Sequence, residues 1–394
     1  MSLRVLMIAP TPFFGDRGCH IHIYEQIRAL IRLGIQVRLC TYPLGRDLEG
    51  LDRVRTWRPP GIHREKIGPA RERYLLDALL FLTCLHEANA FRPDIIHAHL
   101  HEGTLIGCAV RCFTGIPVLF DLQGSLTGEM QAHGYLRPGT MKEGWFRWLE
   151  RVLDQGADFL VATSSASRDE AIRSFGVPPE RAALLLDGVD CGDFRPGLEC
   201  ADLRARYDLS ATKPVVVYLG LLTHYQGTDC LIESIPLVLD QAPETVFLIM
   251  GYPDEQRYAQ LARSRGIPDR NIRFSGRVAY HEAPRHLCLG EIAVSPKLGL
   301  TEANGKLYNY MACGLPTVAF DNPMNREILD DTGLYAETGS SSSLAGQMLR
   351  LLKNPGLARN LGTGARKRAV EHFGWQGVAT RLVRFYERII AERR

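Results

Sequence analysis

The chain has 394 residues, of which 45% are hydrophobic and 23% charged, with a formal net charge of +3. This composition is typical of a globular protein long enough for two domains, and so small a charge gives no reason to expect nucleic-acid binding. The 10 cysteines form no Cys-x-x-Cys pair, so neither a zinc site nor a disulfide framework is indicated.

The hydrophobic run 75–85 contains Asp77 and is too short to span a bilayer. Residues 1–10 form a short strand-like run without a signal-peptide cleavage pattern. Both observations favour a cytoplasmic protein.

The first half of the chain alternates short apolar strands with helices. The expected strands are 3–9, 35–41, 94–99, 117–122, 158–162 and 182–186. The expected helices are 18–33, 75–91, 103–113, 141–155 and 165–175, the last capped by serines at 164, 165 and 167. This alternation predicts a parallel sheet with helices on both faces.

A turn-rich passage over 187–197 is the expected linker, and a second alternating block follows it. Its expected strands are 214–219, 246–250, 272–275, 291–294 and 317–320. Its expected helices are 228–239, 254–265, 281–289, 344–352, 356–372 and 375–392, with a further short helix before Gly314. We therefore predict an α/β protein of two Rossmann-like doubly wound domains, 1–190 and 191–374, that face a cleft. Ligands of such sheets lie at the carboxyl ends of the strands.

Hydride chemistry with a dinucleotide is disfavoured. The loop after the first strand is Pro10-Thr11-Pro12-Phe13-Phe14-Gly15-Asp16-Arg17-Gly18, which is not a Gly-x-Gly-x-x-Gly fingerprint. The chain has no Walker lysine loop either.

The most informative segment runs from Thr301 to Val318. A polar loop leads into a short amphipathic helix that Gly314 ends, and an apolar strand follows. A helix N-terminus attracts phosphate, Gly305 lets a ligand approach the backbone, and Lys306 adds a positive charge. The pattern predicts a phosphate-binding loop.

This segment resembles the nucleotide-sugar diphosphate loop of the family 4 glycosyltransferases, which have the GT-B fold. In that family the loop leads into a Glu-Ala-Met-Ala-Cys-Gly-Leu-Pro-Val-Val run. Here 311–316 keep the Met-Ala-Cys-Gly-Leu-Pro part, whereas Asn309 and Tyr310 replace the Glu and Ala. The resemblance covers nearly the whole chain. It implies that the helix at 375–394 packs back on the first domain.

The resemblance also implies two glutamates eight positions apart that contact the sugar and the ribose. Counting back from Asn309 gives Thr301, with Glu302 beside it. With a loop one residue longer, Glu302 fills the sugar-facing role, and Asn309 bonds the ribose through a neutral amide. The alternative is a solvated Glu302.

The residues 220–229 match the family segment Gly-Arg-Leu … Lys-Gly, whose cations clamp the leaving diphosphate. Leu221 and Gln226 stand in place of both cations, after an intact Gly220. Negative charge that develops on the diphosphate needs stabilisation, for which Lys306 and Lys297 are the expected replacements.

Two further groups are expected to help bind the diphosphate: the helix start at Asn304 and Gly305, and Arg17 of the first domain. The alternative for Lys306 is an exposed lysine at a helix start.

In the first domain, Gly15 and Gly18 are expected to admit donor or acceptor atoms, Arg17 to meet a phosphate, and Asp16 to lie on the acceptor side. The alternative is a tight turn with a solvated arginine.

His97 and His99 share a strand face, so metal binding is conceivable. Structural or acceptor-side use, with His99 on the acceptor side, is favoured, because the family ends this strand in a similar His-x-His without metal. Gln123 replaces the family's cleft histidine and is expected to hydrogen-bond a sugar hydroxyl without acting as acid or base. Strand alternation is expected to point Asp121 to the opposite side from Gln123. Both a buried capping role and a role in the site are open for Asp121.

The segment 46–73 is basic and rich in turn residues, which predicts a long irregular loop. A solvated loop is favoured over a contact with anionic lipid, although family members often meet lipids through this half. Trp145, Phe146 and Trp148 lie near two arginines. We expect such aromatic spacing to pack into a core, with an interfacial anchor as the alternative.

The leading hypothesis is a retaining glycosyltransferase that moves a sugar from a nucleoside-diphosphate-sugar to a hydroxyl of a glycan or lipid-linked acceptor. The resemblance implies that it uses no metal and no other cofactor. Lys306, Glu302 and Gln123 are the expected catalytic residues. Two alternatives are an inactive relative that binds a glycan or partner, and a sugar-nucleotide epimerase, which would need cleft carboxylates.

Overall fold

The computed structural model describes residues 2–62, 72–132, 134–210, 212–299 and 303–393, and divides into two compact units. Unit 1 comprises Met1–Gly188, Thr301–Ala303 and Trp375–Arg394, and unit 2 comprises Val189–Leu300 and Asn304–Gly374. The division lies two residues before the expected boundary at 190. Within the described residues, no helix is long and apolar enough to cross a membrane.

Unit 1 is built on a sheet whose neighbouring strands are all parallel, in the order β3-β2-β1-β4-β5-β6-β7. Its strands are β1 (Arg4–Ala9), β2 (Gln36–Thr41), β3 (Arg53–Arg55), β4 (Ile95–His99), β5 (Val118–Leu122), β6 (Phe159–Ala162) and β7 (Ala182–Leu184). Its α-helices are α1 (Gly18–Arg32), α2 (Glu72–Phe91), α3 (Leu100–Thr114), α4 (Leu126–Ala132), α5 (Met141–Gly156), α6 (Ser165–Arg173) and α15 (Trp375–Arg393). The central strands β4 and β5 are buried along their whole length, and β1 is buried after Arg4, because helices cover both faces.

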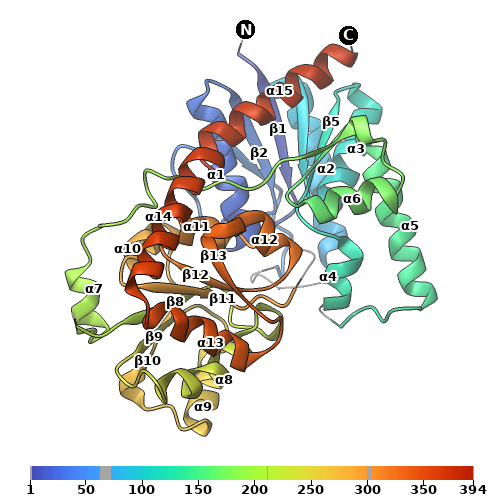
Figure 1. Ribbon diagram of the computed structural model, residues 1–394. Helices are drawn as coiled ribbons and strands as arrows, with labels where there is room; N and C mark the ends of the chain where they lie inside the picture. Colours follow the sequence, from blue (N-terminus) through green and yellow to red (C-terminus); the bar gives the residue numbers. More distant parts are fainter. Residues whose placement is uncertain (1, 63–71, 133, 211, 300–302, 394) are drawn as a thin grey trace. The chain divides into compact units, whose positions relative to one another are not determined.

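Two groups of helices cover the sheet of unit 1. Helices α1 and α15 pack on each other, and α2, α3 and α5 form the second group. Figure 1 shows the red α15 beside the blue α1, and both helices are part of unit 1. The ring of Phe385 stacks on Phe159 of β6, with centroids 5.2 Å apart.

Unit 2 repeats the plan with a parallel sheet of order β10-β9-β8-β11-β12-β13. Its strands are β8 (Val215–Leu219), β9 (Val246–Met250), β10 (Ile272–Gly276), β11 (Ile292–Ser295), β12 (Thr317–Phe320) and β13 (Gly333–Ala336). Its α-helices are α7 (Ala201–Arg206), α8 (Thr228–Leu239), α9 (Glu255–Ser264), α10 (Ala283–Leu287), α11 (Lys306–Ala312), α12 (Pro323–Leu329), α13 (Ser341–Leu352) and α14 (Pro355–His372). The sheet of unit 2 has the 3-2-1-4-5-6 order, and the sheet of unit 1 has the same order with a seventh strand at its edge, which confirms the predicted pair of doubly wound domains. The expected cleft stays a prediction.

Several short helices and strands were not predicted from the sequence. The segment expected as one irregular loop contains β3, whose arginines 53 and 55 both pair with Asp47. An Arg-Val-Arg edge strand has no apolar run to reveal it, and 63–71 of that loop lie outside the described residues. The helices α4, α7 and α12 and the strand β13 are also short and were not predicted. The expected serine cap is confirmed, since Ser164 Oγ accepts from the Ser167 N–H.

Candidate functional site

The sheet order of unit 2 places a topological switch point between β8 and β11. The chain continues to β9 and β10 on one side of this pair and to β12 and β13 on the other. Ligands of doubly wound sheets bind outside the carboxyl ends of the strands at such a point. Gly220 follows β8 and Lys297 lies two residues after β11, so both predicted site residues occupy this position.

The loops after β8 and β11 are fixed against each other through their backbones. The N–H groups of Leu298 and Gly299 both donate to the Tyr225 carbonyl, at 2.9 and 3.1 Å. Gly227 has a φ of +73°, and a β-carbon there would lie 1.7 Å from the Pro296 carbonyl oxygen. Only glycine fits this contact, so a glycine at position 227 is required for the two loops to lie this close together.

Lys306, the first residue of α11, extends to the end of β8. Its ammonium donates a 2.7 Å hydrogen bond to Gln226 Oε1 and lies 4.6 Å from the centre of the Tyr218 ring. A β-carbon at Gly220 would lie 2.8 Å from the same nitrogen. The alternative of an exposed lysine is therefore wrong. The structure joins Lys306, Gln226 and Gly220, three of the predicted site residues.

The electrostatics of this group suit an anion. Burial, together with the nearby charge of Lys297, lowers the pKa of Lys306 well below its usual value. Lys297 is itself 3% exposed. Lys306 is half-buried. Because the two lysines repel each other when both are charged, they destabilise the folded protein, and a bound anion would remove that cost.

Asn304 is part of the framework around the site. Its side-chain amide is 2% exposed and donates to Ser295 Oγ at 2.9 Å and Asn325 Oδ1 at 2.8 Å. These bonds hold the start of α11 against β11. Gly305 is exposed with open space around its Cα, and Asn309 is half-buried on α11. Both expected donor contacts stay predictions, and Thr301 and Glu302 lie outside the described residues.

In unit 1 the switch point lies between β1 and β4, and the predicted loop at Gly15, Asp16, Arg17 and Gly18 follows β1. Asp16 has a φ of +47° and forms an ion pair with Arg46. Arg17 is the N-cap of α1, and Gly18 is exposed at its first position. The structure places this loop where a ligand would bind, and the roles of its four residues stay predictions.

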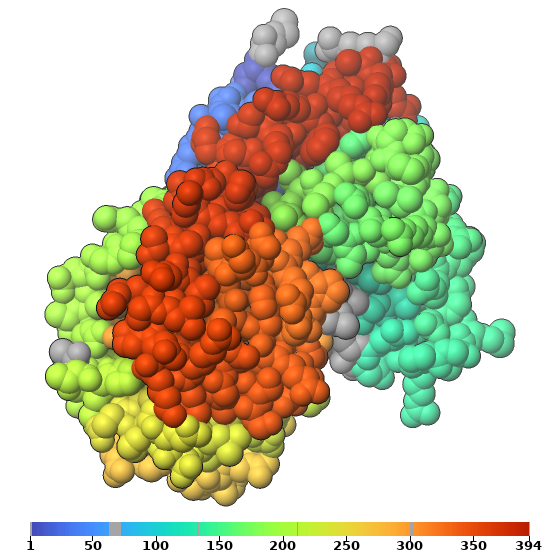
Figure 2. Space-filling view, in the orientation of Figure 1, coloured from blue at the N-terminus to red at the C-terminus, as the bar shows by residue number. Residues whose placement is uncertain are grey.

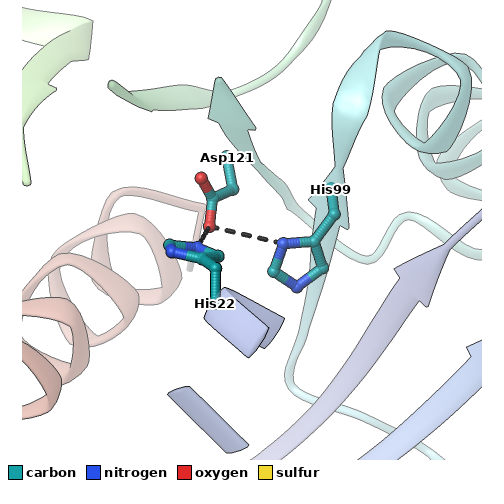
Figure 3. A group of neighbouring side chains, drawn as sticks. All are labelled: His22, His99 and Asp121. Atoms are coloured by element: carbon teal, nitrogen blue, oxygen red, sulfur yellow. Dashed lines mark hydrogen bonds and ion pairs between the residues drawn. The ribbon is translucent and has the colours of Figure 1, made fainter. Parts of the chain in front are cut away.

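The carboxyl end of β4 meets a buried network of histidines and carboxylates (Figure 3). His22 of α1 bonds Asp121 Oδ2 through Nε2 at 2.8 Å and Asp187 Oδ1 through Nδ1 at 2.7 Å. The same Asp121 oxygen lies 3.3 Å from His97 Nε2 and 3.3 Å from His99 Nδ1. As predicted, His97 and His99 share a face, and their rings stack with centroids 4.4 Å apart.

The charges of this network are settled by its two carboxylates. Burial opposes charge on His22, but Asp121 and Asp187 together raise its pKa well above the usual value. The same pairing lowers the pKa of Asp121 despite its burial. Burial lowers the pKa of His97, and lowers that of His99 to about 3. The network is therefore a buried imidazolium between carboxylates, flanked by neutral imidazoles.

The expected orientation of Asp121 is wrong. Gln123 Nε2 lies 3.2 Å from His99 Nδ1, the nitrogen that also faces Asp121. Residues two apart on a strand share a face, so Asp121 and Gln123 point the same way. Gln123 thus reaches the end of β4, and its contact with a sugar stays a prediction.

His22 was not predicted as a site residue. The signal that could have indicated it is a histidine among apolar residues on the buried face of α1. With His99 and Asp121 it forms a group of potential metal ligands whose atoms lie within 4.8 Å of one another. Both ring nitrogens of His22 are already bonded to carboxylates, so a cation would have to replace those bonds. The Nε2 of His99 has no hydrogen-bond partner among the described residues. The expectation that the protein uses no metal stays a prediction.

The two tryptophans of α5 do not pack into a core as expected, whereas Phe146 is half-buried. Trp145 and Trp148 are 54% and 57% exposed, and Met141 and Val152 continue the same stripe along the helix. The teal-green surface of this segment is visible in Figure 2. Twelve of the large hydrophobic residues that are exposed among the described residues belong to unit 1, against two in unit 2.

Two family models match the chain. The "Glycosyl transferase 4-like domain" matches residues 17–188 and "Glycosyl transferases group 1" matches 213–354. The chain is 26% identical to a D-inositol 3-phosphate glycosyltransferase of Frankia alni, over 96% of this chain and 97% of that one.

Solved structures share the fold. A sucrose-phosphate synthase from Thermosynechococcus elongatus superposes with a TM-score of 0.82 at 20% identity, over 99% of this chain and 100% of that one. Anabaena HepE in complex with UDP and glucose gives 0.79 at 15% identity, over 98% and 99%. With the two parallel sheets and the matched domains, these findings show that the chain belongs to the family 4 glycosyltransferases of the GT-B fold.

Proposed function

We propose that this glycosyltransferase moves a sugar from a nucleoside-diphosphate-sugar to an acceptor hydroxyl, with retention and without a metal ion. The observation that carries the proposal is the pair of lysines at the switch point of unit 2, Lys297, which is buried, and Lys306, which is half-buried. Two cations brought close together and largely withdrawn from water fit a ligand with two adjacent negative groups.

In the proposed reaction the bond between the anomeric carbon and the diphosphate oxygen breaks, and negative charge grows on the diphosphate. Lys306 and Lys297 stabilise that charge. The acceptor hydroxyl attacks from the face that the diphosphate leaves, and a diphosphate oxygen takes the hydroxyl proton. The protein groups position the reactants and stabilise charge. A divalent cation would need oxygen ligands, whereas the charged groups gathered here are lysines.

The comparisons support the classes of donor and acceptor. The Anabaena protein was solved with UDP, and the Frankia protein is named for D-inositol 3-phosphate, a polyol with free hydroxyls. We therefore take UDP as the first nucleotide to test. The acceptor stays a glycan or a lipid-linked hydroxyl.

The test is calorimetric titration of the protein with UDP, GDP and ADP. Lys306→Met keeps most of the side-chain volume and removes the charge. Lys353→Met is the matched control, because Lys353 of unit 2 also donates to a glutamine, Gln241, but on the exposed surface. We expect one nucleotide to bind, with at least tenfold weaker binding in Lys306→Met and unchanged binding in Lys353→Met.

Failure of all three nucleotides to bind the wild-type protein would contradict the donor site and favour a scaffold role. Once the nucleotide is known, release of the free nucleoside diphosphate from its sugar conjugate measures turnover. Activity that persists in excess chelator is expected, and loss of activity that Mg²⁺ restores would refute the metal-free reaction.

We also propose that the exposed stripe of α5 contacts an anionic lipid surface. Trp145 and Trp148 lie on the stripe, and Lys142, Arg147 and Arg151 are exposed beside it. Tryptophan favours the boundary between lipid and water, and basic residues are attracted to anionic headgroups. Such a contact would bring a lipid-linked acceptor to the enzyme.

A further inference from the structure

The outer surface of α2 and α3 in unit 1 is apolar. Tyr74, Leu75 and Leu82 of α2 are 79%, 52% and 59% exposed, and Leu105 and Phe113 of α3 are 53% and 72% exposed. We call these five side chains the α2–α3 face. The structure describes both helices in full, and none of their exposed positions carries a lysine or an arginine.

The α2–α3 face is one continuous surface, because the two helices lie side by side (Figure 1). Near their starts, Arg73 and Glu102 form an ion pair at 3.9 Å. Further along, the rings of Phe81 and Phe113 are in contact, with centroids 6.1 Å apart. Both contacts advance together along the two helices, so α2 and α3 run in the same direction.

Each helix carries a large side chain on both sides of a small one, at positions three or four residues apart. The two sets are Leu75, Ala78 and Leu82 on α2, and Leu105, Ala109 and Phe113 on α3. Residues at this spacing lie along one side of a helix. Both alanines fall between the two contacts just described, so they lie at a similar level and mark the middle of the face.

This pattern is self-complementary. A second copy, turned by 180° about an axis that crosses both helices at the alanines, would run its own α2 and α3 antiparallel to the first pair. Leu75 of each copy would then meet Leu82 of the other, and the alanines would let the helices approach closely.

The charges at the two ends of α2 fit the same arrangement. Glu72 lies one turn before Leu75, and His86, whose side chain is 78% exposed, lies one turn after Leu82. In an antiparallel pair, Glu72 of each copy would lie toward His86 of the other. An acid would therefore face a base at both ends of the contact.

The area of the α2–α3 face suits a stable homodimer. With about 150–200 Å² for each fully exposed side chain, its five members expose about 500–600 Å². A stable dimer buries about 800 Å² on each partner, of which about two-thirds is apolar. An apolar patch of this size on a monomer typically marks an interaction site.

We propose that the α2–α3 face is the interface of a homodimer, in which two copies of this chain pack α2 and α3 antiparallel against each other. Anionic lipid is the poorer partner, because its headgroups attract basic residues, which are exposed on α5 and not on this face. The whole face belongs to unit 1, so the proposal does not depend on the donor site proposed in unit 2.

The first test is sedimentation equilibrium of the full-length protein, which should have twice the chain mass of 44.1 kDa. Leu82→Lys puts a charge into both halves of the interface, so dimerisation should weaken at least about a hundredfold. Leu237→Lys is the matched control, because Leu237 is an exposed leucine of α8 in unit 2, and this variant should stay dimeric. Circular dichroism checks that both variants are folded.

The second test is a cross-link that needs no loss of stability. Ala78→Cys, combined with Cys112→Ser to remove an exposed natural thiol, places one thiol of each copy near the twofold axis. Mild oxidation should join two chains through position 78, as shown by peptide mapping. The control is Ala90→Cys in the same background, because Ala90 is also exposed on α2 but lies three turns away. It should stay unlinked.

Three results would overturn the proposal: a wild-type protein that is monomeric at every concentration, a dimer that survives Leu82→Lys, or equal cross-linking of Ala78→Cys and Ala90→Cys. A monomer whose binding to lipid vesicles is lost in Leu82→Lys would assign the face to lipid and also overturn it.

Discussion

The Lys306 ammonium donates a 2.7 Å hydrogen bond to the side-chain oxygen of Gln226. Gln226 stands where the resemblance places a diphosphate-binding lysine, so the side chain of Lys306 brings a charge from α11 to the position that lost one. The neutral amide of Gln226 orients that ammonium without competing for its charge.

Nucleotide binding should take up protons. Burial and the charge of Lys297 lower the pKa of Lys306 in the free protein, and a bound diphosphate would raise it again. Because the complex then holds more protons, affinity should fall as the pH rises from about 7 to 9. Calorimetry of UDP binding at one pH, in two amine buffers of different ionisation enthalpy, measures the uptake. An observed binding enthalpy that is the same in both buffers would contradict the proton uptake. In Lys306→Met the binding enthalpy should no longer depend on the buffer.

The variant Gly220→Ala should weaken nucleotide binding by displacing Lys306. The added β-carbon would lie 2.8 Å from Lys306 Nζ and 3.1 Å from the Tyr218 hydroxyl. We expect a loss of binding similar to that of Lys306→Met, measured by the same titration. The control is Gly346→Ala in α13, where a β-carbon meets nothing within 4 Å. This variant should bind normally and gain up to about 1 kcal/mol of stability. Normal binding by Gly220→Ala would refute the placement of Lys306.

The buried histidines should make unit 1 sensitive to acid. Burial lowers the folded-state pKa of His99 to about 3, whereas an unfolded histidine titrates near 6.5. Between these values the unfolded state binds more protons, so stability should fall as the pH drops below about 6.5. His99 alone accounts for about 2 kcal/mol between pH 7 and 5.

Urea unfolding at several pH values checks this dependence. The variant His99→Gln should show a smaller loss of stability between pH 7 and 5 than the wild type. The control is His86→Gln, because 78% of the His86 side chain is exposed. Its free energy of unfolding should depend on pH as in the wild type. If the free energy of unfolding fell equally with pH in all three proteins, His99 would be taking up its proton in the folded state.

The exposed stripe of α5 should bind vesicles that contain anionic lipid. Trp145→Ser and Trp148→Ser each remove a large apolar surface, so cosedimentation with phosphatidylglycerol vesicles should weaken by about tenfold. The control is Trp57→Ser, because Trp57 is also exposed, at 65%, but lies outside α5. Added salt should reduce binding by screening the basic residues. Equal binding to neutral vesicles, or an equal effect of Trp57→Ser, would refute this surface.

Local sequence patterns determined the architecture of this protein. Apolar runs such as that of β1 are buried on both faces, which parallel strands require, so their alternation with helices predicted both sheets. The same reasoning failed for β3, a half-buried edge strand of arginines and valine. It also failed for the tryptophans of α5, because spacing along a helix does not show which face meets the sheet.

The sequence by itself determined the alternation of strands and helices, and it predicted a phosphate-binding loop with a cationic replacement at Lys306. Only the tertiary structure decided that Lys306 meets Gln226 and that His22 joins Asp121. These partners are 80 and 99 positions apart. Hydrogen bonds and pKa values depend on atoms within a few ångströms, and the crossovers of a parallel sheet bring such distant residues together.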